Sequence, residues 1–225
     1  MPLNNRGFTV VEVPELQDAV TETFNHMPLD QYSGGKHRTR RFSQYKMNYN
    51  DREWKLELLP ARPFMQSKEY NVLVGGIPRN FKPLEFNPEK QIAVGAMNIP
   101  LPIDREWQIN VHQCRVRTNQ EIKGVSVPEG PHRDGHEYGM VIVFGRKNIE
   151  GGVTQLLPNG GGDPFFEVEL QENNAIVYDD GRMFHYATDI IATEEIGGYR
   201  DLWIVAYNEW KNRRYGSNFE ARANQ

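Results

Sequence analysis

Hydrophobic and polar residues alternate in short runs along most of the chain, a pattern typical of strands with one buried face. The clearest run is W-Q-I-N-V-H-Q-C-R-V-R at 107–117, in which Trp107, Ile109 and Val111 share one face. Runs of the same kind predict a mainly β protein. The other expected strands are 8–13, 40–49, 54–58, 138–144, 153–157, 165–170, 175–178, 185–191 and 202–207.

Helical patterns are confined to the first half of the chain. Pro14 opens a run with apolar residues at helical spacing, which predicts a helix to about Phe24. The segment 71–102 is rich in proline and glycine, so irregular structure is expected there apart from a short helix near 88–94. Turns rich in Gly, Asn and Asp separate the later strands, which favours a sandwich or barrel, and a closed double-sheet jelly roll is one solution.

Length and charge narrow the class of protein. With 225 residues, 38% of them hydrophobic and 11% aromatic, the chain can bury a substantial core, and a single domain at 1–225 is expected. A formal net charge of −4 indicates neither a nucleic-acid partner nor an anionic membrane. One basic run, K-H-R-T-R-R at 36–41, stands out, and we interpret it as a solvated or strand-edge cluster.

Cysteine usage bears on compartment and on metal chemistry. Cys114 is the only cysteine, which excludes an intramolecular disulfide and any metal site built from several thiolates. The first residues, M-P-L-N-N-R-G-F, lack an apolar signal core. No run approaches the ~18 apolar residues of a membrane helix. We therefore expect a soluble protein in the reducing cytoplasm.

The segment P-E-G-P-H-R-D-G at 128–135 carries the first chemical signal, and its prolines and glycines exclude a helix. In an extended chain His132 and Asp134 point to one face, while Arg133 points away. An imidazole, a carboxylate and one distant histidine form the 2-His-1-carboxylate triad of non-heme Fe(II) sites. With 6 histidines and 30 acidic residues in the chain, this motif alone is weak. A third ligand and a cosubstrate anchor are needed.

His185 is the third ligand that we choose, because it opens a strand directly after the D-D-G turn at 179–181. Arg200 opens the next expected strand. If the two strands form a hairpin with its loop around 192–197, His185 and Arg200 lie nearly opposite each other. An arginine there could bind a carboxylate bidentately a few ångströms from the metal. The dicarboxylate 2-oxoglutarate, whose other end chelates iron, fits that span.

Several of these residues have alternative interpretations. Arg200 could simply pair with Asp201 or Asp189. Arg115 and Arg117 project from the strand before the metal segment and are candidates for a substrate carboxylate, but an ordinary salt bridge is equally compatible with their positions.

Two further histidines are not assigned to the metal. His112 lies within the alternating strand, so we interpret it as a core or wall residue. His136 is four residues from His132, a spacing found in zinc-binding helices, but Pro131 and Gly135 argue against a helix there.

Four blocks occur in one order: P-E-G-P-H-R-D-G, F-G-R-K-N-I-E-G-G, D-D-G-R-M-F-H and G-G-Y-R-D. In this order they resemble the bacterial 2-oxoglutarate/Fe(II)-dependent dioxygenase family that includes L-isoleucine 4-hydroxylase. The resemblance covers about 107–207, whereas the first hundred residues match only loosely. It implies a double-stranded β-helix, which is a jelly roll, with a few flanking helices and an iron and 2-oxoglutarate core at about 107–210.

The resemblance also implies the roles of the site residues. His132, Asp134 and His185 would hold Fe(II), and Arg200 would bind the distal carboxylate of 2-oxoglutarate. Ser126, six residues before His132, falls on the same face if the segment stays extended, so its hydroxyl is expected to donate to the cosubstrate. With O2 such an enzyme hydroxylates its substrate and releases succinate and CO2.

The implied substrate is a small molecule, a free aliphatic L-amino acid such as isoleucine, leucine, valine or methionine. Its zwitterion requires an arginine for the carboxylate and an acid or carbonyl for the ammonium group. Another small molecule or a peptide remains open, as do desaturation and ring closure. A non-oxidative, metal-binding cupin-like protein is the alternative class, although such proteins usually present more histidines per metal. The oligomeric state is not predicted.

Overall fold

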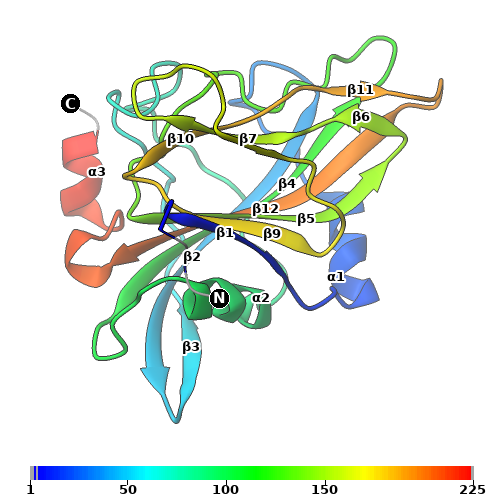
Figure 1. The fold of residues 1–225 in the computed structure, drawn as a ribbon. Helices are drawn as coiled ribbons and strands as arrows, with labels where there is room; N and C mark the ends of the chain where they lie inside the picture. Colours follow the sequence, from blue (N-terminus) through cyan, green and yellow to red (C-terminus); the bar gives the residue numbers. More distant parts are fainter. Residues whose placement is uncertain (1–2, 4, 224–225) are drawn as a thin grey trace.

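Two antiparallel sheets form the framework of this computed structural model, which describes residue 3 and residues 5–223 (Figure 1). Among these residues the large sheet has the order β1-β9-β5-β12-β4-β2-β3, the small sheet has the order β10-β7-β8, and β11 pairs with β6. The strands are β1 (Phe8–Glu12), β2 (Arg38–Asn50), β3 (Glu53–Leu58), β4 (Trp107–Thr118), β5 (Tyr138–Lys147), β6 (Ile149–Gly151), β7 (Thr154–Pro158), β8 (Phe166–Val168), β9 (Asn174–Asp179), β10 (Met183–Ala187), β11 (Ile190–Ala192) and β12 (Gly198–Glu209). The fold is mainly β and is the expected jelly roll.

The helices are α1 (Asp18–Glu22), α2 (Glu89–Asn98), α3 (Ser217–Ala223) and the 3-10 helices η1 (Thr23–His26) and η2 (Trp210–Asn212). Of these, α1, η1 and α2 contribute side chains to the core on one face of the large sheet. Trp203, Val205 and Tyr207 of β12 are fully buried in the same cluster as Ile92 of α2. The Tyr207 hydroxyl donates to the Ile92 carbonyl at 3.0 Å. In Figure 1, α2 lies on the side of the large sheet opposite β7 and β10. In the described part of the chain, no helix combines the length and apolar character needed to cross a membrane.

The other face of the large sheet points toward the small sheet. Because side chains alternate along a strand, every second residue of β12, β4 and β2 lies on this inner face. Three rows of neighbouring residues cross it in the order β12, β4, β2: Arg200, Val116 and Arg38; Leu202, Cys114 and Arg40; Ile204, His112 and Phe42.

Most of the expected strands are present, and the differences concern their ends. The strand expected at 107–117 runs to Thr118, and that expected at 202–207 extends to Gly198–Glu209. The helix expected at 14–24 is shorter, because Gln17 is still extended and α1 begins only at Asp18. The short helix near 88–94 is α2, which continues to Asn98. The strand β6 and the helix α3 were not expected.

The hairpin expected between His185 and Arg200 is wrong. The segment 185–191 contains two strands, and the chain changes sheets between β10 and β11. His185 therefore pairs with Leu156 of β7, whereas Arg200 pairs with Val116 and Arg146 in the large sheet. The two side chains reach the same space from opposite sheets rather than along one hairpin.

Gly95 of α2 tests the packing of the helical layer. A Cβ at this position would lie 2.2 Å from the Tyr207 Oη and 2.7 Å from the Met140 Sδ. Alanine favours a helix by about 1 kcal/mol over glycine, but overpacking of this kind costs about 1–3 kcal/mol. Gly95→Ala should therefore lower the free energy of unfolding in denaturant titrations. The loss should shrink in a Tyr207→Phe background, which removes the nearest oxygen, and a stabilised Gly95→Ala protein would contradict this packing.

Candidate active site

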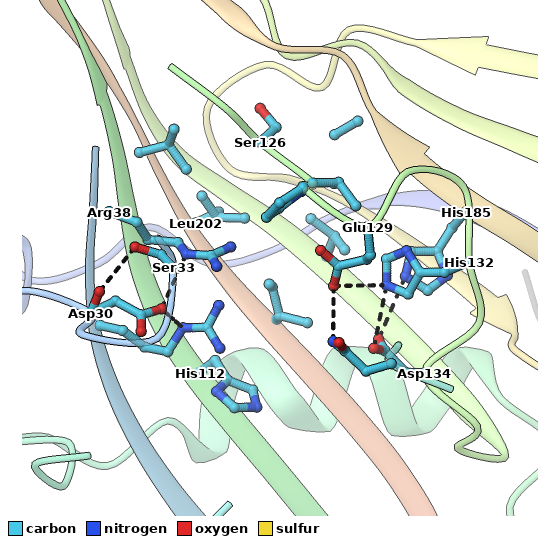
Figure 2. Close-up of a pocket in the computed structure, with 18 of the residues that line it drawn as sticks. Asp30, Ser33, Arg38, His112, Ser126, Glu129, His132, Asp134, His185 and Leu202 are labelled. Carbon is cyan, nitrogen blue, oxygen red and sulfur yellow. Dashed lines mark hydrogen bonds and ion pairs between the residues drawn. The ribbon is translucent and has the colours of Figure 1, made fainter. Parts of the chain in front are cut away.

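A cavity of about 440 Å³ lies between the two sheets (Figure 2). Its floor is the inner face of the large sheet, including Leu202 and Ile204 of β12, and the small sheet contributes Thr154 and His185. The volume falls within the range of small-molecule sites, which is roughly 300–1,000 Å³. The cavity therefore suits a small ligand with both apolar and charged groups.

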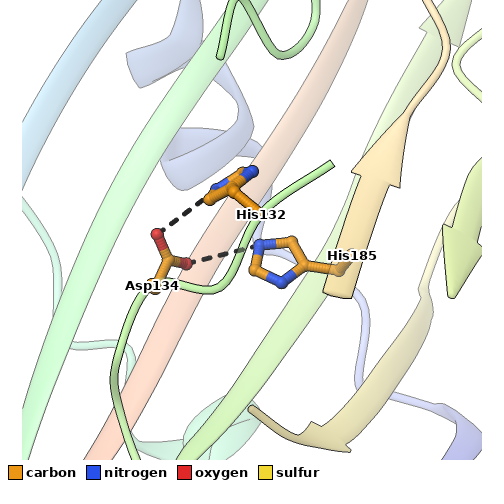
Figure 3. Close-up of side chains that lie close together, drawn as sticks. All are labelled: His132, Asp134 and His185. Atoms are coloured by element: carbon orange, nitrogen blue, oxygen red, sulfur yellow. Dashed lines mark ion pairs between the residues drawn. The ribbon is translucent and has the colours of Figure 1, made fainter. Parts of the chain in front are cut away.

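His132, Asp134 and His185 lie together at one side of this cavity (Figure 3). One potential ligand atom from each residue lies within 4.8 Å of the others. The Nε2 of His132 is 3.5 Å from Asp134 Oδ1, and the Nε2 of His185 is 3.5 Å from Asp134 Oδ2. Two imidazoles and one carboxylate on one side of a cavity match the donor set of a facial triad. Among the described residues this is the one such cluster.

A pair of backbone hydrogen bonds brings the two histidines together. The amide of His132 donates to the His185 carbonyl at 3.1 Å, and the amide of His185 donates back at 2.9 Å. This isolated bridge adds the segment around His132 to the free edge of β10. Directly opposed residues have close side chains, and the two imidazole ring centroids are 4.4 Å apart.

Asp180 fixes the segment that carries Asp134, a role that the sequence analysis missed. Its buried carboxylate accepts hydrogen bonds from the amides of Asp134, Gly135 and His136 at 3.1, 2.7 and 3.0 Å. One carboxylate oxygen also lies 3.6 Å from the Nδ1 of His185. The D-D-G motif at 179–181 was the available signal, but in the sequence it predicted only a turn before His185 and no role for the Asp180 side chain.

Gln66 orients the Asp134 side chain and was also missed. Its Nε2 donates to Asp134 Oδ1 at 3.0 Å, and its Oε1 accepts from Arg79 Nη2 at 2.7 Å. Gln66 lies in the proline-rich part of the chain, where the sequence offers no periodicity from which to infer such a contact.

The charges of the triad stabilise each other. Burial alone would lower the pKa of His132, but the hydrogen bond and charge of Asp134 outweigh it and raise that pKa to about 9. Burial would raise the pKa of Asp134, but the imidazoles of His132 and His185 hold it well below its ordinary value. The carboxylate is therefore ionised, as a metal ligand must be.

Arg200 lines the same cavity and is 2% exposed. Its Nη2 is 3.5 Å from the Thr154 hydroxyl, and its Nε has no hydrogen-bond partner in the described part of the chain. Burial and the neighbouring charge of Arg146 lower the pKa of Arg200 to about 10, so the side chain stays cationic at neutral pH. The pairings with Asp201 or Asp189 considered from the sequence are not observed. A buried cation without a carboxylate partner fits an anionic ligand.

Ser126 also lies in the wall of the cavity. Its amide donates to Asp189 Oδ1 at 3.1 Å, whereas its buried hydroxyl has no partner among the described residues. The hydroxyl is thus free to donate to a ligand.

Arg115 and Arg117 do not line the cavity, although the sequence suggested them for a substrate carboxylate. Arg115 instead forms a buried bidentate salt bridge with Asp201, at 2.6 and 2.7 Å, and also donates to Asn25. Strand alternation explains this, because odd-numbered residues of β4 point away from the inner face on which Val116 lies. The ordinary salt bridge, left open from the sequence, is the observed role of Arg115.

His112 and His136 both lie in the cavity wall but outside the triad. His112 stacks on Phe42 with ring centroids 4.4 Å apart, and burial and nearby arginines lower its pKa well below the ordinary value. His136 contacts Asn208 through Nδ1 at 2.8 Å, and burial together with Arg214 lowers its pKa to about 3. Both are neutral wall residues. The core or wall position of His112 agrees with the sequence analysis, which for His136 argued only against a metal-binding helix.

The basic run at 36–41 was interpreted as a solvated or strand-edge cluster, and the first of these alternatives is wrong. The strand residues of the run do lie in the part of β2 that β3 leaves unpaired. Arg40 and Arg41 are 7% and 5% exposed, and Arg38 is partly buried. Alternation along β2 sends Arg38 and Arg40 into the cavity and Arg41 to the other face, where it pairs with Glu85. The run therefore contributes two cations to the candidate site.

The profile of the family described as 2OG-Fe dioxygenase matches residues 21–206, most of the chain. The chain belongs to the 2OG-Fe dioxygenase family. No match was found among curated proteins.

Solved structures agree with the fold of this 2OG-Fe dioxygenase. A bsmA homolog (Mpe_A2762) from Methylobium petroleophilum PM1 superposes with a TM-score of 0.76 at 23% identity, covering 92% of this chain and 90% of that one. IDO from Bacillus thuringiensis gives 0.70 at 19% identity, covering 91% and 94%. The Fe(II)/(alpha)ketoglutarate-dependent dioxygenase TqaL gives 0.61 at 15% identity, covering 91% and 82%. At these identities the likeness concerns the fold.

Family membership establishes Fe(II) as the metal and 2-oxoglutarate and O2 as the cosubstrates. The residues present fit them. The cavity contains a His-Asp-His donor set for the metal. It also contains Arg200, a buried cation whose Nε has no acceptor among the described residues.

Asp180 allows a test of how the triad is held. Asp180→Asn keeps the shape of the side chain but removes the negative charge that accepts from three amides and lies near His185. Co(II) serves as an air-stable probe of the iron site. The affinity for Co(II) should fall about 10- to 100-fold, because residues that orient metal ligands contribute to metal affinity. Absorbance titration with Co(II) measures this effect. The matched control is Asp179→Asn, since among the described residues the Asp179 carboxylate accepts one hydrogen bond, a local one from the Gly181 amide at 3.0 Å. Equal Co(II) affinity in the two variants would exclude a positioning role for Asp180.

Proposed function

We propose that this 2OG-Fe dioxygenase hydroxylates a free aliphatic L-amino acid, of the kind represented by isoleucine, leucine, valine and methionine. Among family members it would thereby resemble the subgroup that includes L-isoleucine 4-hydroxylase. The observation that carries the proposal is a single cavity of about 440 Å³ in which apolar side chains and unpaired cations line the same space as the triad.

In this proposal His132, Asp134 and His185 hold Fe(II), and Asp180 and Gln66 orient these ligands. Fe(II) and 2-oxoglutarate held there would supply the oxidising chemistry, in which O2 is reduced, 2-oxoglutarate is converted to succinate and CO2, and a C–H bond of the substrate is oxidised. The chain binds and orients the reactants and excludes water from the cavity.

Arg200 binds the distal carboxylate of 2-oxoglutarate through its planar guanidinium group, since its Nε has no acceptor among the described residues. The Ser126 hydroxyl, also without a partner, donates a hydrogen bond to the same cosubstrate. The two residues together would anchor the end of 2-oxoglutarate that does not chelate the metal.

Other reactions use the same site. Another small molecule, a peptide, desaturation and ring closure all require the same iron and 2-oxoglutarate, so the substrate assay must distinguish them. Family membership argues against a non-oxidative cupin-like protein.

The test is aerobic incubation of the purified protein with Fe(II), 2-oxoglutarate and each proteinogenic amino acid in turn. We expect succinate formation coupled to a product that is one oxygen atom heavier by mass spectrometry, with several aliphatic side chains accepted at graded rates, because a methylene changes binding by only about 1–3 kcal/mol. His185→Ala should abolish turnover and keep the β-rich circular dichroism spectrum. A screen in which capped peptides outperform every free amino acid would refute the proposed substrate class.

The variant Arg200→Lys tests whether Arg200 binds the cosubstrate or the substrate. Lysine keeps the charge but loses the planar fork, so the KM for 2-oxoglutarate should rise about 10- to 100-fold while Co(II) affinity stays unchanged. Arg115→Lys is the control, because Arg115 is a buried arginine outside the cavity; it should lower thermal stability without changing this KM. If Arg200→Lys raised the KM of the amino acid instead, Arg200 would be a substrate residue.

A further inference from the structure

Three arginines at one end of the cavity leave positive charge unbalanced. Arg38, Arg40 and Arg79 line this end together with Asp30, and Glu129 is the other carboxylate of the cavity wall outside the triad. Within the described residues, three guanidinium groups thus face two carboxylates. Burial and the charge of Arg40 lower the pKa of Arg79 to about 10, so it remains cationic at neutral pH. Unpaired buried charge is unfavourable, and a bound anion would balance it.

Asp30 contacts two of these arginines through their Nε atoms. It is 2% exposed, and its Oδ2 lies 3.1 Å from the Nε of Arg38 and 3.2 Å from the Nε of Arg40. The contact with Arg40 is an ion pair without a hydrogen bond, because this Nε has no hydrogen-bond partner. The other described contacts of the Arg40 side chain are the Cys114 thiol and the face of the Phe81 ring, 5.4 Å from the guanidinium carbon to the ring centroid, and neither is a carboxylate. Arg40 therefore has donors available for a ligand carboxylate.

Arg79 is held in the cavity wall by contacts of its own. Its Nη2 donates to Gln66 at 2.7 Å, and its guanidinium carbon lies 4.5 Å from the centroid of the Phe64 ring. These contacts hold Arg79 in place beside Arg40, where its charge adds to the field at this end of the cavity.

Glu129 brings a carboxylate to the opposite side, next to the triad. Its Oε1 lies 3.9 Å from the Nε2 of His132 and accepts a hydrogen bond from Asn71 Nδ2 at 3.3 Å. Its side chain is 18% exposed, and it lines the cavity. Figure 2 shows Glu129 on the side of the triad, with Arg38 and Asp30 facing it across the cavity.

We propose that Arg40 binds the α-carboxylate of the amino-acid substrate and that Glu129 binds its α-ammonium group. Arg38, which shares Asp30 with Arg40, adds positive charge beside the carboxylate. This assignment rests on the proposed function and names the residues that recognise the carboxylate and ammonium groups of the substrate.

Arg40 and Arg200 serve two different carboxylates. Arg40 lies on β2 and Arg200 on β12, with β4 between them. Neighbouring strands are about 4.8 Å apart, so the two backbones are roughly 10 Å apart across the sheet. One sheet face can thus hold the cosubstrate at Arg200 and the substrate at Arg40 without competition. The orientation that follows places the α-ammonium group nearer the metal than the α-carboxylate.

The test compares three probes: the amino acid that the wild type oxidises fastest, its amide and its 2-hydroxy acid. The wild type should lose about 10- to 100-fold in kcat/KM with either analogue, because each leaves one charged residue unpaired. In Glu129→Gln, an isosteric change, the preference for the amino acid over the 2-hydroxy acid should largely disappear, whereas the preference over the amide should persist. Arg40→Lys should show the reverse pattern, with a KM for the amino acid raised about 10-fold.

Controls come from a pair on the opposite face of β2. Arg41 and Glu85 form an ion pair at 2.7 Å outside the cavity. Arg41→Lys and Glu85→Gln should leave all three probes at wild-type rates. Glu129→Gln and Arg40→Lys should leave the Co(II) affinity and the KM for 2-oxoglutarate unchanged. These two measurements distinguish a loss of substrate recognition from damage to the iron or cosubstrate site.

The outcomes distinguish this assignment from the proposed function. A wild type that oxidises no free amino acid refutes both. A wild type that oxidises an amino acid, with both variants keeping wild-type discrimination, refutes only the assignment of Arg40 and Glu129. If a variant fails to fold, the wild type decides, because equal rates with the amino acid, amide and 2-hydroxy acid would by themselves exclude a subsite for the zwitterion.

Discussion

The two backbone hydrogen bonds between His132 and His185 are the constraint on which the site depends. They join a segment without regular structure to the edge of the small sheet, and so they place residues 53 positions apart side by side. Asp180 strengthens the same junction, because one carboxylate holds three amides of the segment and lies near the ring of His185. The geometry of the triad is thus set by backbone contacts and a buried carboxylate, and the ligand side chains need only extend from it.

Buried positive charge in the wall of the cavity is the second constraint. Arg200, Arg40 and Arg79 are nearly inaccessible to solvent, and burial makes each of them unfavourable unless an anion is near. Asp30 provides only part of this compensation. A cavity with this excess of positive charge is destabilising when empty and favours anionic ligands, since each bound carboxylate removes an unpaired charge. Binding energy and specificity therefore arise from the same buried arginines.

The sequence predicted most of the strands, and it singled out the three residues that the structure brings together at the triad. Alternation located β2, β4 and β12, because each has one face in the helical core and the other on the cavity. The hairpin was wrong because the change of sheet after Ala187 depends on pairing with distant strands, and local turn residues do not encode it. The basic run was misjudged for a similar reason: only the position of β2 within the sheet decides that Arg40 is inside. Asp180 and Gln66 were missed because their contacts are made with residues far along the chain.

The central place of β12 in the large sheet has a consequence for synthesis on the ribosome. This strand, Gly198–Glu209, lies between β4 and β5 and pairs with both along most of its length. A nascent chain that has emerged only through β11 therefore leaves one edge of β4 and one edge of β5 unpaired, and such edges readily recruit other chains. The inner face that carries Arg200 is completed only when β12 fills this gap.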